Sequence, residues 1–585
     1  MKLHAYQWEV ITPALEGKNI IIWLPTGAGK TRAAVYVAMR HLEMKQNAKV
    51  SLIVNKVHLV QQHYSNEFQT GLGDKYKVIA ISGDNESKFF FSKLVKDNDV
   101  IICTAQILQN ALNSTSEEKH VELTDFSMII IDECHHTHKD GIYNKLMAEY
   151  LEKKICHQLK MPQILGLTAS PGTGRANSFE KAVEHILQIC ANLDTLKIMS
   201  AEVHREDLEA KVKQPKKKYD LVTDRVEDPF GNKLKEIMKT IHEYLDMTLS
   251  EFGTQLYEQK IVELEKEGAM ESNRMKRTCA LHLRKYNDSL LIHDTVTMLD
   301  AFEHLDEFYQ QEKIIRDLSD PTEAYLCQLY DYNRARLLKL AEDTRFENPK
   351  LMKLEEILRD HFQVSTDFRG IIFTCTRQST YSLHKWIAGK NSLQRVGLKT
   401  AALTGAGQSK QCRQNNRSEQ QEVIEHFRKG RLNLLISTSV AEEGLDIPQC
   451  NIVVRYGLMT NEISMVQARG RARAEDSCYS FLGKTGGSEV RREVTNESLE
   501  DLMKRAIEHV QKMPQKEYEE KIKDLQRQCL LARKVKQEER NEMKNMFLPE
   551  EVRLLCRSCM QPVCHGDDLR TIEQAHHVNI NSNFR

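Results

Sequence analysis

The sequence predicts an α/β protein in which two parallel-sheet domains are separated by a helical block. Short apolar runs alternate with helix-length segments over residues 1–190 and again over residues 346–475, a rhythm typical of parallel sheets with crossover helices. Residues 232–345 instead contain one proline and few glycines, and their apolar positions recur at helical spacing. The length of 585 residues suits about three to five domains.

The composition argues against a strongly basic or membrane-embedded protein. The chain has 83 basic and 83 acidic side chains, so any nucleic acid would be met by a local groove rather than by a globally basic surface. No apolar run approaches the ~20 residues that span a bilayer, and the amino terminus has no secretory signal, so no membrane insertion is expected. The 14 cysteines are scattered, which is typical of reduced thiols in the cytoplasm.

The first chemical motif is a glycine turn that follows an apolar strand at residues 20–24 and leads into a helix. Its glycines allow backbone N–H groups to close around an anion, and Lys30 brings a positive charge to the β- and γ-phosphates. Thr31 offers a hydroxyl ligand for Mg²⁺, so the turn predicts a site for ATP with Mg²⁺. The full Walker spacing would put its first glycine at Leu24, and a chance glycine-rich turn is the alternative. The turn consists of Pro25, Thr26, Gly27, Ala28, Gly29, Lys30 and Thr31.

A second motif supplies acidic side chains at the end of the apolar run 128–131, which reads as a buried parallel strand. Ligands gather at such strand ends. Asp132 is expected to hold Mg²⁺, and Glu133 is expected to polarise the water that attacks the γ-phosphate. The alternative is that these acids simply end a strand in solvent.

The second half of the chain adds an arginine-rich motif at residues 467–473. A nucleotide held only by the first half would leave its γ-phosphate without cationic stabilisation. Arg471 and Arg473 are placed to supply that charge from a second domain, although a solvated basic turn is the alternative.

Together these motifs resemble a superfamily-two helicase core. Their exact sequences resemble those of the RIG-I-like receptors, cytosolic sensors of viral double-stranded RNA. The resemblance implies two RecA-like domains with ATP between them. It adds Leu3 and Gln7 as adenine-reading residues, and Gly444, Asp446 and Gln467 as further nucleotide-site residues. The last motif usually ends in Gln-x-x-Gly-Arg-x-x-Arg, but this sequence has Ala474 in place of the final arginine. Arg471 is therefore the better supported arginine, and Arg473 is expected to replace the missing one.

The same resemblance assigns RNA contacts to residues that follow expected strands. Residues 168–170 would couple ATP to RNA, and the implied partners are double-stranded RNA, related RIG-I-like receptors and antiviral signalling proteins. The match is closest to the member without amino-terminal caspase-recruitment domains, because the adenine-reading motif begins at Leu3. The expected RNA contacts are Asn55, Lys56, Ser82, Gly83, Thr104, Gln106, Thr374, Thr404 and Thr438.

The resemblance also implies a division of the chain. The helical insertion would help to embrace the RNA duplex, with a simple packing bundle as the alternative. The later helical segment, broken near Pro514, would be a V-shaped pincer rather than a solvated tail. Residues 213–218 are expected to be an exposed linker. The expected parts are helicase domain 1 (1–190), a connector (191–231), the helical insertion (232–345), helicase domain 2 (346–475), the pincer (476–546) and an incomplete zinc-binding RNA-recognition domain (547–585).

The last segment contains half of a structural zinc site. Cys556 and Cys559 form one Cys-x-x-Cys pair, whereas tetrahedral thiolate sites usually need two. Cys564, His565, His576 and His577 are alternative ligands with unfavourable spacing. Bound Zn²⁺ is therefore doubtful in this chain.

These observations lead to the hypothesis of an RNA-dependent ATPase that regulates antiviral signalling by related receptors. A branched-DNA helicase or translocase would share every nucleotide motif and is the alternative enzyme. An RNA clamp whose hydrolysis mainly proofreads or recycles the complex is the alternative binding protein.

Overall fold

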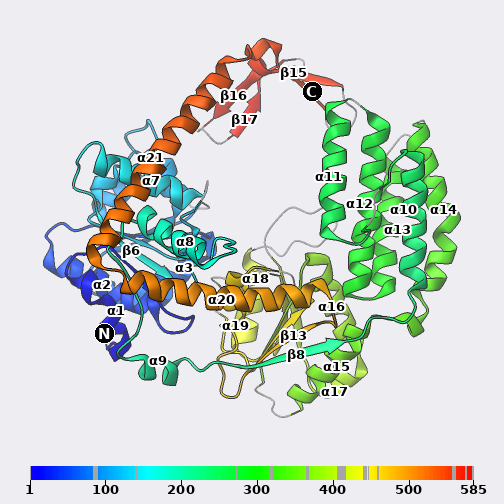
Figure 1. Ribbon diagram of the computed structural model, residues 1–585, viewed down its shortest axis with the longest axis horizontal. Helices are drawn as coiled ribbons and strands as arrows, with labels where there is room; N and C mark the ends of the chain where they lie inside the picture. Colours follow the sequence, from blue (N-terminus) through cyan, green and yellow to red (C-terminus); the bar gives the residue numbers. More distant parts are fainter. Residues whose placement is uncertain are drawn as a thin grey trace.

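The computed structural model describes residues 2–83, 90–138, 141–248, 251–271, 273–315, 320–363, 368–404, 417–438, 445, 447–457, 460–556, 561–572 and 576–582. Viewed down the shortest axis, its elements are arranged in a ring (Figure 1). Two sheet domains form the lower left and the bottom, a block of helices forms the right side, and a long helix leads to small hairpins at the top.

The first domain contains a seven-stranded parallel sheet in the order β3-β4-β2-β5-β6-β1-β7. Apolar clusters form on the sheet's two faces, which is what a parallel sheet covered by helices requires. The strands are β1 Ile20–Trp23, β2 Val50–Val54, β3 Val78–Ile81, β4 Val100–Thr104, β5 Met128–Ile131, β6 Gln163–Thr168 and β7 Lys197–Met199. The helices are α1 Ala5–Leu15, α2 Lys30–Met44, α3 Val57–His63, α4 Gln69–Leu72, α5 Phe91–Asp97, α6 Ala105–Leu112, α7 Ile142–Ile155 and α8 Phe179–Asn192.

The second domain contains a six-stranded parallel sheet in the order β10-β11-β9-β12-β13-β8. The two predicted parallel sheets are therefore confirmed. The strands are β8 Lys216–Val222, β9 Gly370–Phe373, β10 Thr400–Leu403, β11 Leu434–Ser437, β12 Ile452–Tyr456 and β13 Cys478–Lys484. The helices are α15 Pro349–Phe362, α16 Arg377–Gly389, α17 Asn391–Arg395, α18 Arg417–Arg428 and α19 Glu462–Arg469.

The segment expected to be a connector contributes to both sheets, which corrects the expected boundaries. β7 pairs with β1, so the first sheet continues past residue 190. α9 (Arg205–Lys211) follows, and then β8 pairs with β13 along seven residues. Residues 216–218, expected in a linker, are therefore an exposed edge strand, and β13 carries the second domain past residue 475.

The predicted helical block is confirmed and lies between β8 and α15. Leu234, Ile237 and Ile241, three of the apolar positions that recur at helical spacing, are buried in its core. The helices are α10 Pro229–Tyr244, α11 Gln255–Met270, α12 Arg274–Thr295, α13 Met298–Ile315 and α14 Pro321–Ala341.

Two long helices follow the second sheet, as the sequence predicts. α20 (Ser488–Lys512) and α21 (Gln515–Asn545) meet at a break beside Pro514. α20 packs against α8 and α19, whereas α21 packs against α7 and α8, so the pair connects the two domains. Beyond α21 lie two small antiparallel hairpins: β14 Arg553–Leu555 with β15 Pro562–His565, and β16 Leu569–Ile572 with β17 His576–Asn579. In the described part of the chain, no helix combines the length and apolar character needed to cross a bilayer.

Candidate functional site

Three neighbouring strands of the first sheet deliver the expected nucleotide residues and the expected coupling motif to one edge. The glycine turn follows β1, Asp132 and Glu133 follow β5, and Ala169 and Ser170 follow β6. The sheet order β5-β6-β1 places these strands side by side, and their carboxyl ends meet at the same edge. Such edges are where α/β sheets bind ligands.

The glycine turn has the backbone that an anion cradle needs. Gly27 and Gly29 have φ angles of 87° and 76°, in the left-handed region that favours glycine. Lys30 begins α2, and its Nζ donates to the carbonyl oxygens of Leu24 at 3.0 Å and Pro25 at 3.3 Å. Burial lowers the pKa of Lys30, although the negative charges of Glu133 and Asp132 act in the opposite direction.

The amino-terminal motif lies directly against this turn. Gln7 Nε2 donates to the carbonyl oxygens of Ala28 at 3.0 Å and Gly29 at 3.2 Å. Tyr6, which the sequence interpretation did not select, donates its hydroxyl to the same Ala28 oxygen at 3.0 Å. Leu3 is buried in the apolar cluster that also contains Ala28. The expected adenine-reading residues and the phosphate turn therefore form one structure.

The two acidic residues have different environments. Nε2 of His63 lies 2.9 Å from Oδ2 of Asp132. Burial would raise the pKa of Asp132, but the hydrogen bond and charge of His63, with the charge of Lys30, lower it below its ordinary value. Glu133 has a φ of 46°, an uncommon backbone conformation for a residue with a side chain.

The side chain of Glu133 is placed beside the third strand end. Its Oε2 is buried and accepts no hydrogen bond from a described residue. Nδ1 of His135 lies 3.4 Å from that oxygen and 3.0 Å from the hydroxyl of Thr168. A buried carboxylate oxygen without a donor is suited to accept a hydrogen bond from a water molecule.

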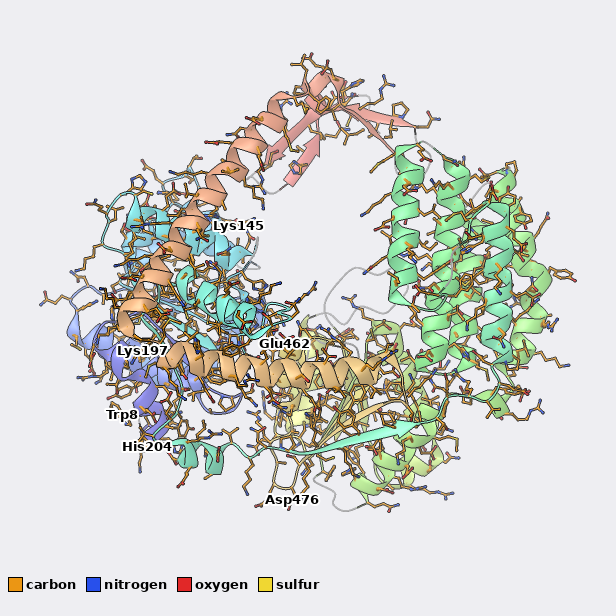
Figure 2. The ribbon with its side chains drawn as sticks, in the orientation of Figure 1. Trp8, Lys145, Lys197, His204, Glu462 and Asp476 are labelled. Atoms are coloured by element: carbon orange, nitrogen blue, oxygen red, sulfur yellow. The ribbon has the colours of Figure 1, made fainter. Side chains whose placement is uncertain are left out.

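The two sheet domains meet at the glycine turn. Thr173 donates its backbone N–H and its hydroxyl to Oε1 of Glu462, at 2.9 and 2.7 Å. Glu462 begins α19 and lies where the two domains meet (Figure 2). At the end of α19, a Cβ added to Gly470 would lie 2.9 Å from Cβ of Thr26. The arginine-rich motif is therefore packed against the turn.

The two candidate arginines are not equivalent. A Cβ added at Gly27 would lie 2.7 Å from Nη1 of Arg473, so this guanidinium lies over the turn. Arg471 is buried, and its Nη1 donates to the carbonyl oxygen of Leu445 within the second domain at 2.8 Å. Arg473 also donates, from Nη2 to the carbonyl oxygen of Ile447 at 3.4 Å, so both arginines contact carbonyl oxygens of the second domain. Gln467 is buried on α19, whereas Gly444 and Asp446 lie outside the described residues.

Helix α20 contacts the arginine-rich motif of the second domain and the expected coupling motif of the first, which sequence reasoning missed. Arg469 of α19 forms a bidentate pair with Glu500 of α20, with N–O distances of 2.8 and 2.5 Å. One turn further along α20, Sδ of Met503 accepts from the hydroxyl of Ser170 at 3.3 Å and from the N–H of Gly172 at 3.2 Å. The only sequence signal for these contacts was the helical stripe of α20.

The expected RNA-contact residues lie at the carboxyl ends of the strands on one side of each sheet. In the first domain they follow β2, β3 and β4, and in the second domain they follow β9, β10 and β11. Thr104, Thr374 and Thr404 are buried, whereas Gln106 is exposed. Asn55, Lys56, Ser82 and Thr438 are half-buried, and Gly83 is exposed.

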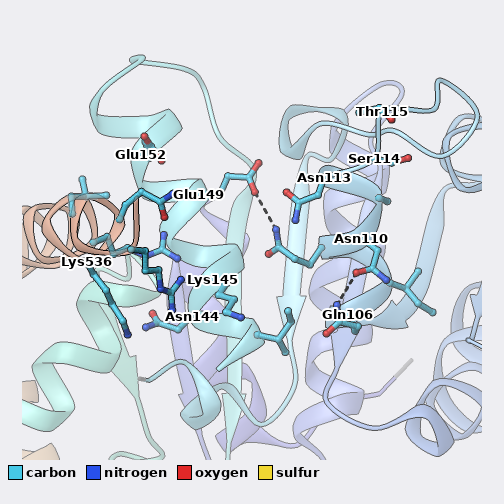
Figure 3. A pocket seen from close by; sticks show the side chains of 18 of the residues that line it. Gln106, Asn110, Asn113, Ser114, Thr115, Asn144, Lys145, Glu149, Glu152 and Lys536 are labelled. Atoms are coloured by element: carbon cyan, nitrogen blue, oxygen red, sulfur yellow. Dashed lines mark hydrogen bonds between the residues drawn. The ribbon is translucent and has the colours of Figure 1, made fainter. Parts of the chain in front are cut away.

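A cavity of about 1670 Å³ lies between α6, α7, α21 and β16. Gln106 lines it and donates to Oδ1 of Asn110 at 2.7 Å. Figure 3 shows Lys536 and Lys145 across the pocket from Gln106 and Asn110. Six basic and two acidic side chains line the cavity, so its charge is positive. The basic residues are Lys119, Lys145, Arg533, Lys534, Lys536 and Arg540.

The expected zinc ligands are only partly described. Cys556 follows β14, and Cys564 is buried on β15. Cys559 lies outside the described residues. Among the residues that the structure does describe, no three His, Cys, Asp or Glu side chains gather as a metal site.

Comparisons with protein families match four segments. A model described as the res subunit of type III restriction enzymes matches residues 1–173, and one described as the helicase conserved C-terminal domain matches residues 349–475. A model described as the RIG-I receptor C-terminal domain matches residues 216–342. A further model, described as the C-terminal domain of RIG-I, matches residues 552–585.

Several curated relatives resemble most or all of the chain. ATP-dependent RNA helicase DHX58 from Mus musculus is 52% identical over 100% of this chain and 86% of the relative. The antiviral innate immune response receptor RIG-I from Homo sapiens is 33% identical over 99% of this chain and 64% of the relative. Dicer-like protein 1 from Pyricularia oryzae is 27% identical over 83% of this chain and 30% of the relative.

Proposed function

Because the chain belongs to the RIG-I-like receptor family of RNA helicases, we propose that it is a double-stranded-RNA-dependent ATPase that binds viral-type RNA in the cytosol. Its proposed biological role is to regulate antiviral innate signalling by related receptors. The observation that carries the ATPase proposal is the assembly of the glycine turn, Asp132 and Glu133 at one sheet edge, with Arg473 above the turn.

The residues at this edge fit ATP with Mg²⁺. The left-handed glycines leave backbone N–H groups for the phosphates, and Lys30 lies near Asp132 and Glu133. Thr31 and Asp132 would hold Mg²⁺, which when bound neutralises charge on the β- and γ-phosphates. The donor set of one hydroxyl and one carboxylate is the kind that Mg²⁺ prefers.

Each catalytic residue then has a distinct role. Glu133 accepts a hydrogen bond from the attacking water and orients it, because its buried Oε2 accepts no hydrogen bond from a described residue and lies 3.4 Å from Nδ1 of His135. Lys30 and Arg473 stabilise the negative charge on the transferred phosphoryl group from opposite domains. Arg471 supports the same site indirectly by holding the carbonyl of Leu445.

The RNA part of the proposal rests on the other half of the sheet edges. The residues that resemble RNA contacts follow neighbouring strands in each domain, so they can meet one nucleic acid. Gln106 also lines the basic cavity between α6 and α21, whose lysines and arginines are suited to phosphate groups. The names of the DHX58 and RIG-I relatives favour RNA and antiviral defence over branched DNA.

A Glu133→Gln variant tests the enzyme directly. It should bind ATP and RNA with near wild-type affinity, because the amide keeps the shape, but RNA-stimulated turnover should fall to background. Glu43→Gln, an exposed residue near the far end of helix α2, is the matched control and should keep turnover. Wild-type turnover by Glu133→Gln would contradict the assigned role. If that variant abolishes turnover but keeps its full cellular effect, the RNA-clamp alternative gains support.

A further inference from the structure

His63 makes a buried contact with the expected magnesium ligand that no motif anticipates. Its Nε2 lies 2.9 Å from Oδ2 of Asp132, although the two residues are 69 positions apart. The side chain of His63 is 8% exposed and that of Asp132 is 13% exposed. Bulk water therefore competes little for this hydrogen bond.

The local backbone holds His63 in place. His63 is the last residue of α3, and the chain passes directly into a π-helical turn at Tyr64–Phe68. Such turns are rare and occur frequently at functional sites. Leu59 and Val60 on one side, and Phe68 on the other, are buried in the same apolar cluster as the glycine turn. The backbone that carries the His63 imidazole is therefore fixed by buried side chains on both sides.

A carboxylate that binds a metal is itself usually hydrogen-bonded, and this second contact orients it. The contact with His63 occupies Oδ2 of Asp132 and limits rotation of the carboxylate. Oδ1 is then the oxygen available to a cation or to a water bound to it. Without His63, the carboxylate would have to be ordered when the cation arrives.

We propose that His63 is a positioning residue that orients Asp132 for Mg²⁺. This inference rests on the proposed nucleotide site and adds a residue of this chain that touches neither ATP nor the reacting atoms. Its role is to set the Mg²⁺ requirement of nucleotide binding, rather than to perform the chemical step.

The test compares two amide substitutions. His63→Gln places an amide nitrogen near the position of Nε2 and can still donate to Asp132, whereas the shorter amide of His63→Asn cannot reach it. His41→Asn is the control, because His41 is a buried histidine of the same domain that contacts Ser127 at 2.9 Å, away from the site.

Binding of a fluorescent ATP analogue is measured while Mg²⁺ is titrated, with no turnover required. In His63→Asn the half-saturating Mg²⁺ concentration should rise by about 10- to 100-fold, the range seen when such supporting contacts are removed. His63→Gln and His41→Asn should stay within about threefold of wild type by the same reasoning. Turnover of His63→Asn should recover largely at saturating Mg²⁺.

Two outcomes would overturn the proposal. An unchanged Mg²⁺ requirement in His63→Asn would remove His63 from the site. Equal losses in the Asn and Gln variants, together with a lower melting temperature measured without Mg²⁺ and nucleotide, would make its role structural only. Failure of the wild-type chain to bind the analogue at any Mg²⁺ concentration would instead contradict the proposed nucleotide site.

Discussion

The nucleotide site and the carboxyl-terminal hairpins are held together in different ways. At the nucleotide site, side chains far apart in sequence contact each other, as in Thr173 with Glu462 across 289 positions. In the hairpins the contacts are local, such as His565 with Glu550 and Asn581 with Asp568. Among the described residues after 548, only Cys564 is buried.

This difference indicates where a substitution will have distant effects. A buried polar network loses more than one contact when a member is changed, because its partners are left unsatisfied. A small exposed hairpin has little apolar surface to lose. Changes at the nucleotide site should therefore alter activity strongly, and changes in the hairpins should leave it intact.

The largest expected effect is that of Lys30→Ala, which should remove ATP binding and reduce RNA-stimulated turnover to background. The reason is that Lys30 supplies the positive charge inside the glycine turn. RNA affinity should stay within a few-fold, because Lys30 lies on the nucleotide half of the sheet edge. Nucleotide binding and RNA binding are measured separately, with the surface variant Lys18→Ala as control. Unchanged hydrolysis in Lys30→Ala would refute the site.

The arginines provide the next test. Arg473→Lys should lower turnover by ~10³, as is typical of losing an arginine finger, because lysine keeps the charge but not the planar fork. Arg471→Lys should also lower turnover, but less, because the guanidinium that lies against Gly27 of the turn is that of Arg473. Nucleotide affinity should change less than turnover in both. A larger loss in Arg471→Lys would restore the ranking expected from the sequence.

An intermediate effect is expected at the contact between α19 and α20. Burial would raise the pKa of Glu500, but the hydrogen bonds and charge of Arg469 lower it to about 2. Glu500→Gln should reduce the unfolding free energy by about 3 kcal/mol, because it leaves Arg469 buried without its partner. Turnover should fall several-fold, since α20 also holds Ser170 through Met503.

The pH dependence of that contribution follows from the lowered pKa. The Arg469–Glu500 pair stabilises the fold fully when the pH is above 4.5, the ordinary pKa of a glutamate. This stabilisation is lost as the pH falls towards 2, the lowered pKa of Glu500. Chemical denaturation at pH 7 and pH 4 measures it, with the exposed Glu508→Gln as control. Equal stability of wild type and Glu500→Gln at pH 7 would show that the pair contributes nothing.

The smallest effect is expected in the hairpins. Changing Cys556 and Cys559 together to serine should leave RNA-stimulated turnover within about twofold, because the sheets bury their own cores without this segment. A lone Cys-x-x-Cys pair should bind well under one equivalent of zinc. Metal analysis decides this: stoichiometric, chelator-resistant zinc that depends on both cysteines would show that the site is completed within these 585 residues.

Much of the nucleotide site could be predicted because its signals are local. The apolar runs before Lys30 and Asp132 are strands β1 and β5. The glycines of the turn predict the left-handed backbone conformation that they adopt. The helical block could likewise be predicted from the spacing of apolar residues such as Leu234, Ile237 and Ile241. In each case neighbours in sequence carry the information.

The remaining features depend on tertiary packing. Residues 216–218 are basic and exposed, so only pairing with β13, over 250 positions later, makes them a strand. His63 and Met503 looked like ordinary helix residues, because their partners come from distant segments. The relative positions of Arg471 and Arg473 likewise follow from how the two domains meet, which spacing within one motif cannot specify.

We propose that duplex RNA controls ATP hydrolysis at the junction of the two sheet domains. The most direct test of this proposal is ATP turnover by the purified chain, titrated separately with blunt duplex RNA, single-stranded RNA and duplex DNA. Duplex RNA should stimulate turnover strongly, and the other two nucleic acids should stimulate it weakly or not at all. Equal or greater stimulation by duplex DNA would contradict it and favour a DNA helicase or translocase.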